Sequence, residues 1–208
     1  VSTSKNLKIG DWIGIPKYNI EGNIQDINLL TTKIVNFDKT ISTIPTYDLL
    51  STEIRNHQVM YEGSSRRIKR SIYFNIKSFK FVDDEFYEKV KDINLISEYM
   101  DRKLREIAES KKNIPHAERI INGQQLTNIG LFRNYVLNYL KNNPKVDQDE
   151  IVLVRQLEIS PQGMPLEIYC FANKAELVDY ERIQADIFDH ILTAAQEFDL
   201  EIMQVAKA

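Results

Sequence analysis

Four cationic side chains gather in one short run of the chain: Arg66, Arg67, Lys69 and Arg70. Such a cluster can contact an anion, for example a lipid headgroup, an acidic protein or a nucleic acid. The same charges at the start of a strand can instead stay solvated and protect the strand edge from mispairing. Alternation of the following residues places Arg67 and Lys69 on a polar face, where they could line an aqueous cavity without binding a ligand.

The other side chains that could do chemistry do not form a catalytic or metal-binding pattern. The histidines share no metal-ligand spacing, and no H-E-x-x-H, C-x-x-C, phosphate-binding glycine loop or nucleophile elbow is present. Cys170 is the single cysteine, so an intrachain disulfide is excluded and a buried thiol is expected. We therefore expect no metal, no cofactor and no enzymatic activity. The three histidines are His57, His116 and His190.

Pairs of acidic residues are frequent, but each has a structural explanation. Asp83-Asp84 precedes a helical pattern and is expected to cap it, while the acidic residues from Asp147 to Glu150 fill a predicted loop. Asp186 and Asp189 lie three residues apart on one predicted helix, where they repel each other mildly.

The composition is that of a globular chain without a membrane span. Its 208 residues are 43 % hydrophobic and 27 % charged, with a net charge of −3, which argues against disorder and against a general nucleic-acid binder. The longest aliphatic run, Ile151 to Val154, is far shorter than the roughly 18 residues that cross a bilayer. No signal peptide is visible, and the chain opens at Val1. We expect the soluble part of a larger protein.

Residues 1–62 are predicted to form a small β-domain. Short β-branched segments alternate with Gly, Pro and Asn/Asp residues, a pattern typical of tightly turned strands. About 60 residues supply only a thin core, so this domain is expected to pack against other subunits or segments. The expected strands are Trp12 to Ile15, Glu21 to Leu29, Thr31 to Phe37 and Thr40 to Ile44, and the expected breaks or turns are Gly14, Gly22, Asp38-Lys39 and Pro45.

Residues 63–208 are predicted to form a ferredoxin-like α/β domain with an inserted helix, so that the whole chain is α+β. The composition changes at Glu62-Gly63-Ser64-Ser65, and the element order beyond it is β-α-β-β-α-β once the extra helix is set aside. The stretch from Lys111 to Gln125 is expected to be irregular. The expected elements are a strand from Arg67 to Lys77 with Ile68, Ile72, Phe74 and Ile76 as its apolar positions, helical pattern from Asp83 to Ile107, a helix from Ile129 to Leu140, strands Ile151 to Ile159 and Leu166 to Ala172, a helix from Leu177 to Phe198 and a terminal strand Glu201 to Val205.

An RNA-binding or protein-interaction module is the alternative interpretation. Small barrels and ferredoxin-like sheets both occur in RNA-binding proteins, where exposed aromatic residues stack on bases. The predicted strands offer Tyr73 and Tyr169 but lack the K/R-G-F/Y type of run that such sheets carry. We expect no nucleic-acid partner.

Several segments together resemble the miniconductance branch of the small-conductance mechanosensitive ion channel family. They keep their order and spacing over nearly the whole chain. Two positions depart from the pattern of that branch. A Trp often follows the Asn that Asn56 matches, and this chain has His57 there. A Gly-Gly pair often precedes the Arg pair, and this chain has Ser64-Ser65 there. The matching segments are Gly10-Asp11-Trp12 with Pro16, Thr32 to Thr46, Arg66 to Ile72, Leu126 to Arg133, Val154 to Glu158, Gly163 to Phe171 and Ile183 to His190.

This resemblance implies a vestibule on the cytoplasmic side of a bacterial inner membrane. Residues 1–62 would be an Sm-like β-domain beneath the pore, and residues 63–208 would form part of a cage around the permeation path. In the family seven identical subunits assemble, membrane tension opens the pore during osmotic downshock, and ions reach the pore through the cage. The implied partners are further copies of the chain, permeating ions, and the membrane through helices that this sequence lacks. Arg66, Arg67, Lys69 and Arg70 would be candidates for lining the vestibule or contacting anions.

Overall fold

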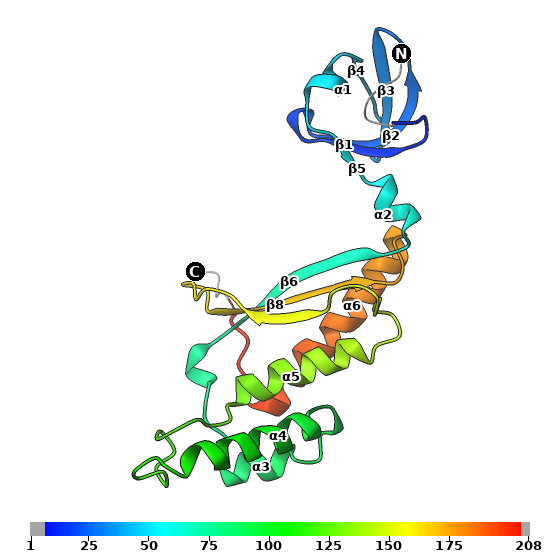
Figure 1. The fold of residues 1–208 in the computed structure, drawn as a ribbon. Helices are drawn as coiled ribbons and strands as arrows, with labels where there is room; N and C mark the ends of the chain where they lie inside the picture. The colour runs from blue at the N-terminus through cyan, green and yellow to red at the C-terminus, as the bar shows by residue number, and fades with distance from the viewer. Residues whose placement is uncertain (1–6, 205–208) are drawn as a thin grey trace. The chain divides into compact units, whose positions relative to one another are not determined.

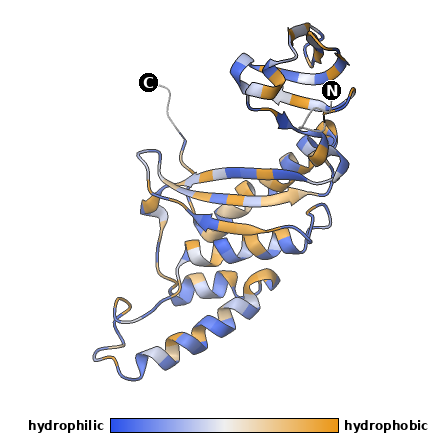
Figure 2. Cartoon of the chain, turned by 45° about the horizontal axis from the view of Figure 1, so that its top comes forward, coloured by the Kyte–Doolittle hydropathy of each residue, from blue (hydrophilic) through white to orange (hydrophobic). Residues whose placement is uncertain are grey.

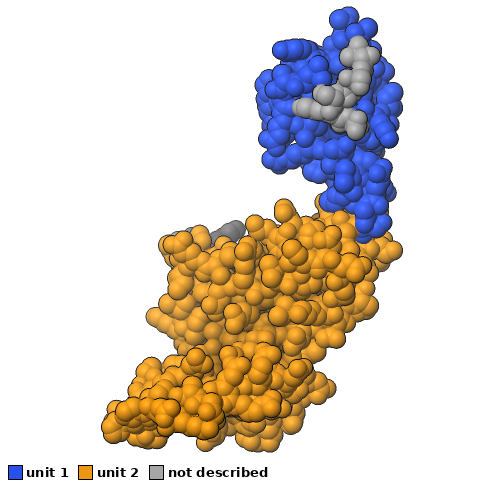
Figure 3. All heavy atoms as spheres, viewed as in Figure 1, with its two compact units in different colours: residues 1–64 blue, residues 65–208 orange. Residues whose placement is uncertain are grey.

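The computed structural model describes residues 7–204 and divides the chain into two compact units, residues 1–64 and residues 65–208 (Figures 1 and 3). Each unit has its own cluster of buried hydrophobic side chains. The sheets are antiparallel and most of the helical residues lie in the second unit, so the predicted α+β class is confirmed. Within the described residues, no helix has both the length and the apolar character that crossing a membrane requires.

Unit 1 is built around an antiparallel sheet that has five strands in its described part. Its elements are β1 (Trp12–Ile15), η1 (Pro16–Tyr18), β2 (Ile20–Ile27), β3 (Thr31–Asn36), β4 (Ile41–Pro45), α1 (Asp48–Ser51), β5 (Arg55–Asn56) and α2 (Gln58–Glu62). The strand order is β4-β3-β2-β1-β5. The predicted strands are therefore confirmed within a few residues at each end. The fully buried hydrophobic residues in the described part of this unit are Ile13, Ile15, Ile24, Ile34, Ile44 and Leu49.

Two glycines that were expected to break strands lie inside them instead. Gly14 pairs with Glu21 in β2, and Gly22 pairs with Asn36 in β3. A β-carbon on Gly22 would lie 2.1 Å from the carbonyl oxygen of Val35, so the neighbouring backbone leaves no room for a side chain. Glycine is required there because two backbones approach closely, and local sequence cannot distinguish that role from a turn.

The imperfect alternation of β2 has a geometric cause. The pairing of β2 with β3 shifts register between Ile24 and Asp26, as in a β-bulge. An extra residue on one strand reverses the side-chain alternation beyond it. Asp26 therefore lies among apolar residues in the sequence, while Ile24 of the same strand stays buried.

Unit 2 contains a three-stranded antiparallel sheet with helices on one face (Figure 1). Its elements are β6 (Arg66–Phe74), η2 (Ile76–Ser78), α3 (Asp84–Val90), α4 (Asn94–Lys111), α5 (Asn128–Lys141), β7 (Leu153–Gln156), β8 (Met164–Ala172), α6 (Leu177–Ala194) and η3 (Ala195–Phe198). The strand order is β6-β8-β7, and an antiparallel bridge joins Phe74 to Ile202 on the other side of β6. This order and the sequence of elements match the predicted ferredoxin-like plan.

Four details of unit 2 differ from the sequence prediction. Ile76 leaves the strand for η2, where the Asn75 side chain accepts a hydrogen bond from the Lys77 backbone amide, and half of Ile76 is exposed. The first helical region is broken at Ile93, whose extended backbone separates α3 from α4. The strand predicted from Ile151 to Ile159 is shorter, as β7. The terminal strand is reduced to the bridge at Ile202, and Val205 lies outside the described residues.

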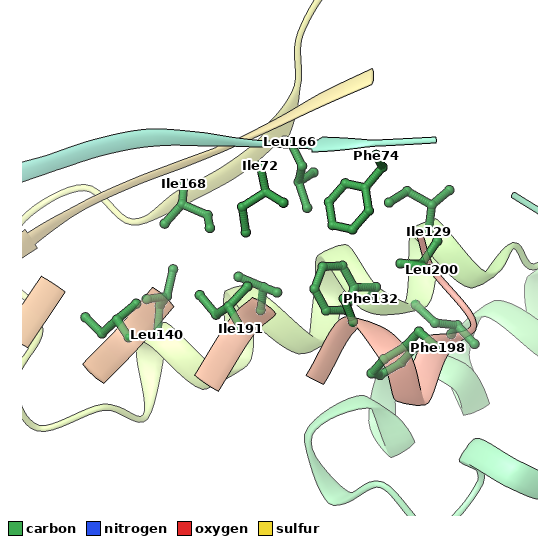
Figure 4. Close-up of a cluster of buried hydrophobic side chains, with 14 of the residues drawn as sticks. Ile72, Phe74, Ile129, Phe132, Leu140, Leu166, Ile168, Ile191, Phe198 and Leu200 are labelled. Atoms are coloured by element: carbon green, nitrogen blue, oxygen red, sulfur yellow. The ribbon is translucent and has the colours of Figure 1, made fainter. Parts of the chain in front are cut away.

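The core of unit 2 lies between the sheet and helices α5 and α6. Ile72, Phe74, Leu166 and Ile168 point from the strands toward Phe132 and its neighbours on the helices (Figure 4). Helices α3 and α4 lie beyond α5, on the side away from the sheet (Figure 1). Hydrophilic and hydrophobic residues alternate along β6 (Figure 2), because one face of the sheet is packed and the other is not.

A fully buried amide, Asn128, joins three segments of unit 2. Its Nδ2 donates to the backbone carbonyls of Ser78 at 2.9 Å and Phe198 at 3.1 Å. Its Oδ1 accepts from the backbone amides of Lys80 at 3.0 Å and Ile129 at 2.9 Å. All hydrogen-bonding positions of this side chain are therefore satisfied without water. The contacts tie the segment after β6 and the end of η3 to the start of α5.

We predict that Asn128→Ala lowers the free energy of unfolding by about 2–4 kcal/mol, because backbone groups from separate segments lose their buried partners. Denaturant titration followed by circular dichroism measures the change. Asn142→Ala is the control: this exposed residue at the end of α5 donates only to Asn138 of its own helix, and its loss should cost less than about 0.5 kcal/mol. Equal losses for the two variants would contradict the role of Asn128.

Asp199, which follows η3, makes a second set of contacts in the same region. Its carboxylate accepts from Lys80 Nζ at 2.8 Å and Lys89 Nζ at 2.7 Å. These two hydrogen bonds hold the pKa of Asp199 below its ordinary value. Its backbone has φ 53°, a left-handed conformation that Asn also tolerates.

We predict that Asp199→Asn is less stable than the wild-type chain at pH 7 and that this difference disappears in acid. A lowered pKa in the folded state stabilises the fold above the unfolded pKa of about 3.9, and that contribution is lost as pH falls through the folded value. Thermal unfolding of both proteins between pH 7 and pH 2 measures the difference. A gap that stays constant across this range would rule out the ion pairs as its source.

Candidate functional site

The sheet of unit 2 has one face that no helix covers within the described residues, and we call it the open face (Figure 1). Strand residues that are directly opposite in an antiparallel pair project to the same face. Lys69 pairs with Tyr169, and Arg155 pairs with Glu167. The open face therefore carries Arg67, Lys69, Ser71 and Tyr73 of β6, Glu167, Tyr169 and Phe171 of β8, and Leu153 and Arg155 of β7.

The four cations that the sequence groups together are divided between the two faces of the sheet. Arg66 and Arg70 reach the helical side, where their guanidinium carbons lie 4.4 Å and 4.3 Å from the ring centroids of Tyr180 and Phe188 on α6. Guanidinium groups at such distances make favourable cation–π contacts. Arg67 and Lys69 lie on the open face, as the alternation predicts. Arg67 and Lys69 are thus the two of these four cations that the open face carries.

A buried carboxylate, Glu167, lies between two cations of the open face. Arg155 Nε donates to Glu167 Oε1 at 2.8 Å, and Arg155 Nη2 forms an ion pair with the same oxygen at 2.7 Å. Lys69 Nζ lies 3.8 Å from the other oxygen, Oε2. The Glu167 side chain is only 6 % exposed, whereas those of Arg155 and Lys69 are 53 % and 49 % exposed. The two cations thus cover the carboxylate and face solvent above it.

Sequence reasoning did not single out Glu167 or Arg155 as site residues. The sequence did indicate on which face Glu167 lies. It alternates with the buried Leu166 and Ile168 and therefore projects to the opposite face of β8. Nothing local shows that Arg155, twelve residues earlier and on another strand, supplies its partner.

The histidines and Cys170 do not form a reactive centre. His57 packs against Trp12, His116 is exposed in the irregular 112–127 segment, and His190 stacks on Tyr139 with ring centroids 4.2 Å apart. Among residues 7–204 no group of three side chains could hold a metal ion. Cys170 is buried in β8, and burial raises the pKa of its thiol to about 12, far above that of a reactive thiol.

The acidic pairs also have structural partners. Asp83 accepts from the backbone amide of Phe86 at 2.8 Å and caps α3, as predicted. Asp147 accepts a short hydrogen bond from Ser65, and Asp186 pairs with Lys145 at 2.6 Å. No pair of these carboxylates shares an environment that would divide acid and base roles.

The two tyrosines considered for base stacking are separated on the open face. Tyr73 pairs with Pro165. Tyr169 pairs with Lys69, which precedes Tyr73 by four residues in β6. Tyr169 instead makes an edge contact with Phe171, at a centroid distance of 5.8 Å. A contiguous stacking platform for RNA bases is not formed by these residues.

Two family models match the chain in the order of its two units. The model described as "Mechanosensitive ion channel, beta-domain" matches residues 1–59, and the one described as "Mechanosensitive ion channel MscS, C-terminal" matches residues 117–202. The chain belongs to the small-conductance mechanosensitive channel family. The family resemblance inferred from the sequence motifs is thus confirmed.

Relatives in this family are distant in sequence and longer than the chain. "Low conductance mechanosensitive channel YnaI" of Escherichia coli is 24 % identical over 190 residues, which are 91 % of this chain and 41 % of that protein. An "Uncharacterized MscS family protein" of Aquifex aeolicus is 33 % identical over 72 residues, 35 % of this chain and 17 % of that protein. The chain therefore spans less than half the length of these relatives.

Solved channel structures share the fold. Wild-type MSL1 of Arabidopsis thaliana has a TM-score of 0.62 and 15 % identity, over 97 % of this chain and 53 % of that one. MscS of Helicobacter pylori in its closed state has a TM-score of 0.54 and 15 % identity, over 98 % of this chain and 59 % of that one. These likenesses support the architecture described above for each unit.

We predict that Arg155→Ala destabilises unit 2 by about 2–4 kcal/mol, because it leaves a buried carboxylate with one distant cation. Lys69→Ala should cost less than about 1 kcal/mol, since the hydrogen bond and the ion pair from Arg155 to Glu167 remain. Equilibrium denaturation of the two variants compares the losses. A larger loss for Lys69→Ala would show that Arg155 is not the main partner of Glu167.

Proposed function

We propose that this chain forms the vestibule region of a mechanosensitive channel that opens under membrane tension during osmotic downshock. The observation that carries the proposal is the ordered match of a β-domain and a C-terminal domain of this channel family to the two units. In the proposal unit 1 lies beneath the pore on the cytoplasmic side of the membrane, and unit 2 belongs to a cage that ions cross. The RNA-binding or protein-interaction alternative is not favoured by these matches.

The open face carries the charges that could act on ions in the proposed vestibule. Arg67, Lys69 and Arg155 place cationic groups on it, and the last two lie beside the buried carboxylate of Glu167. Charges that line an aqueous chamber raise the local concentration of counter-ions and bias which ions reach a pore. We propose that the open face lines the vestibule and that these cations favour the entry of anions.

Assembly with further copies of the chain is part of the proposal. The described core of unit 1 is small, and large apolar side chains remain exposed around it, among them Leu29 at 82 %, Leu30 at 80 % and Tyr47 at 72 %. Exposed apolar groups of this kind mark surfaces that other chains or segments cover. A homo-oligomer, a heptamer by analogy with the family, would supply that cover.

Two measurements on the full-length protein test the proposal. Native mass spectrometry in detergent should give a homo-oligomer, and patch recordings of membranes containing it should give currents that begin at a threshold of applied suction. A monomer that passes no tension-activated current would overturn the proposed function.

We predict that Arg67→Glu and Lys69→Glu in the full-length channel shift the permeability ratio toward cations, because each reverses a charge on the open face. The reversal potential under a salt gradient measures the ratio. Thermal stability should change little for Arg67→Glu, since Arg67 is exposed. Lys69→Glu should lower it, because the new carboxylate lies beside the buried Glu167.

Lys174→Glu supplies the matched control, because this exposed lysine lies in the loop between β8 and α6 and not on the open face. It should leave the reversal potential unchanged. Equal shifts for Lys174→Glu and the open-face variants would mean that net charge, and not position, determines the ratio.

A further inference from the structure

Glu167 is buried in an unusual place, on the face of the sheet that no described helix covers. The residue is 4 % exposed, and Arg155 and Lys69 both lie within 4 Å of its carboxylate. A carboxylate hidden beneath two half-exposed cations does not itself meet ions in solution. It acts on them only through the charges that it neutralises.

Stability alone does not explain this carboxylate. Burying an ion carries a desolvation cost that close hydrogen bonds only offset, and uncharged side chains of similar size often stabilise a fold equally well. The Arg155 guanidinium meets one oxygen of Glu167, through an Nε hydrogen bond at 2.8 Å and an Nη2 ion-pair contact at 2.7 Å, and Lys69 lies 3.8 Å from the second oxygen. One negative charge is therefore shared between two positive groups.

We infer that Glu167 is a specificity-determining residue: it limits the positive charge of the open face and thereby sets its preference among permeating ions. The inference rests on the proposed function, because it requires the open face to meet the ion path. With Glu167 charged, its single negative charge offsets one of the three positive charges that Arg67, Lys69 and Arg155 place on this face. Without that carboxylate, all three positive charges are uncompensated.

The variant Glu167→Gln isolates this effect. An amide oxygen can still accept from Arg155, and the two exposed cations lose only a counter-charge, so the sheet is expected to fold. Each copy of the chain gains one positive charge at the wall of the chamber. We expect the anion-to-cation permeability ratio of the full-length channel to rise about twofold or more at low salt, and the rise to shrink as salt screens the face.

Glu106→Gln is the matched control. Glu106 also lies between a lysine and an arginine, with Lys103 Nζ at 2.6 Å and Arg102 Nε at 3.9 Å, but on the surface of α4. The variant Glu106→Gln makes the same change of net charge and should leave the anion-to-cation permeability ratio unchanged. The double variant Lys69→Gln/Glu167→Gln restores the net charge of the open face and should return the ratio to the wild-type value.

The outcomes separate the inference from the proposed function. Wild-type currents with an unchanged ratio in folded Glu167→Gln overturn the inference and leave the proposed function standing. Equal shifts for Glu167→Gln and Glu106→Gln also overturn it. Should Glu167→Gln fail to fold, Lys69→Gln takes its place: that variant retains Glu167 and must lower the ratio, and an unchanged ratio overturns the inference. A wild-type protein that passes no tension-activated current overturns the proposed function and the inference with it.

Discussion

The hydrogen bonds of one buried amide, Asn128, hold three segments of the larger unit together. A buried amide that lacked partners would cost a large part of the fold's net stability, so the segments that satisfy it are held in place. These segments are the chain after β6, the start of α5 and the end of η3. Helices α5 and α6 pack on one face of the sheet through hydrophobic side chains, and no helix within residues 7–204 covers the other face.

The uncovered face is chemically different from the packed one because β6 alternates. The same run of cations contributes guanidinium groups that stack on aromatic rings of α6 and charged groups that face solvent. Arg66 and Arg70 thus contribute to packing, while Arg67 and Lys69 contribute to a surface potential. One short segment therefore contributes both to packing and to the surface potential. Residue charge alone does not distinguish these two contributions.

Much of the fold follows from local patterns. Strand periodicity, the turn at Asp38-Lys39 and the cap at Asp83 are properties of neighbouring residues, and each is present in the structure. Two of the errors concern residues whose role depends on distant backbone. Gly22 faces Val35 of another strand, and Ile202 meets β6 from the far end of the unit. Propensity and spacing contain no information about such partners.

The sequence by itself determined the α+β class, the order of elements, the family and the parity that puts Arg67 and Lys69 on a polar face. Those features depend on residue type and on spacing along the chain. Only the tertiary structure decided that Glu167 is buried, that Arg155 is its main partner and that the helices of the described residues cover just one face of the sheet. Those features depend on which strands become neighbours, and antiparallel pairing brings together residues that are far apart in sequence.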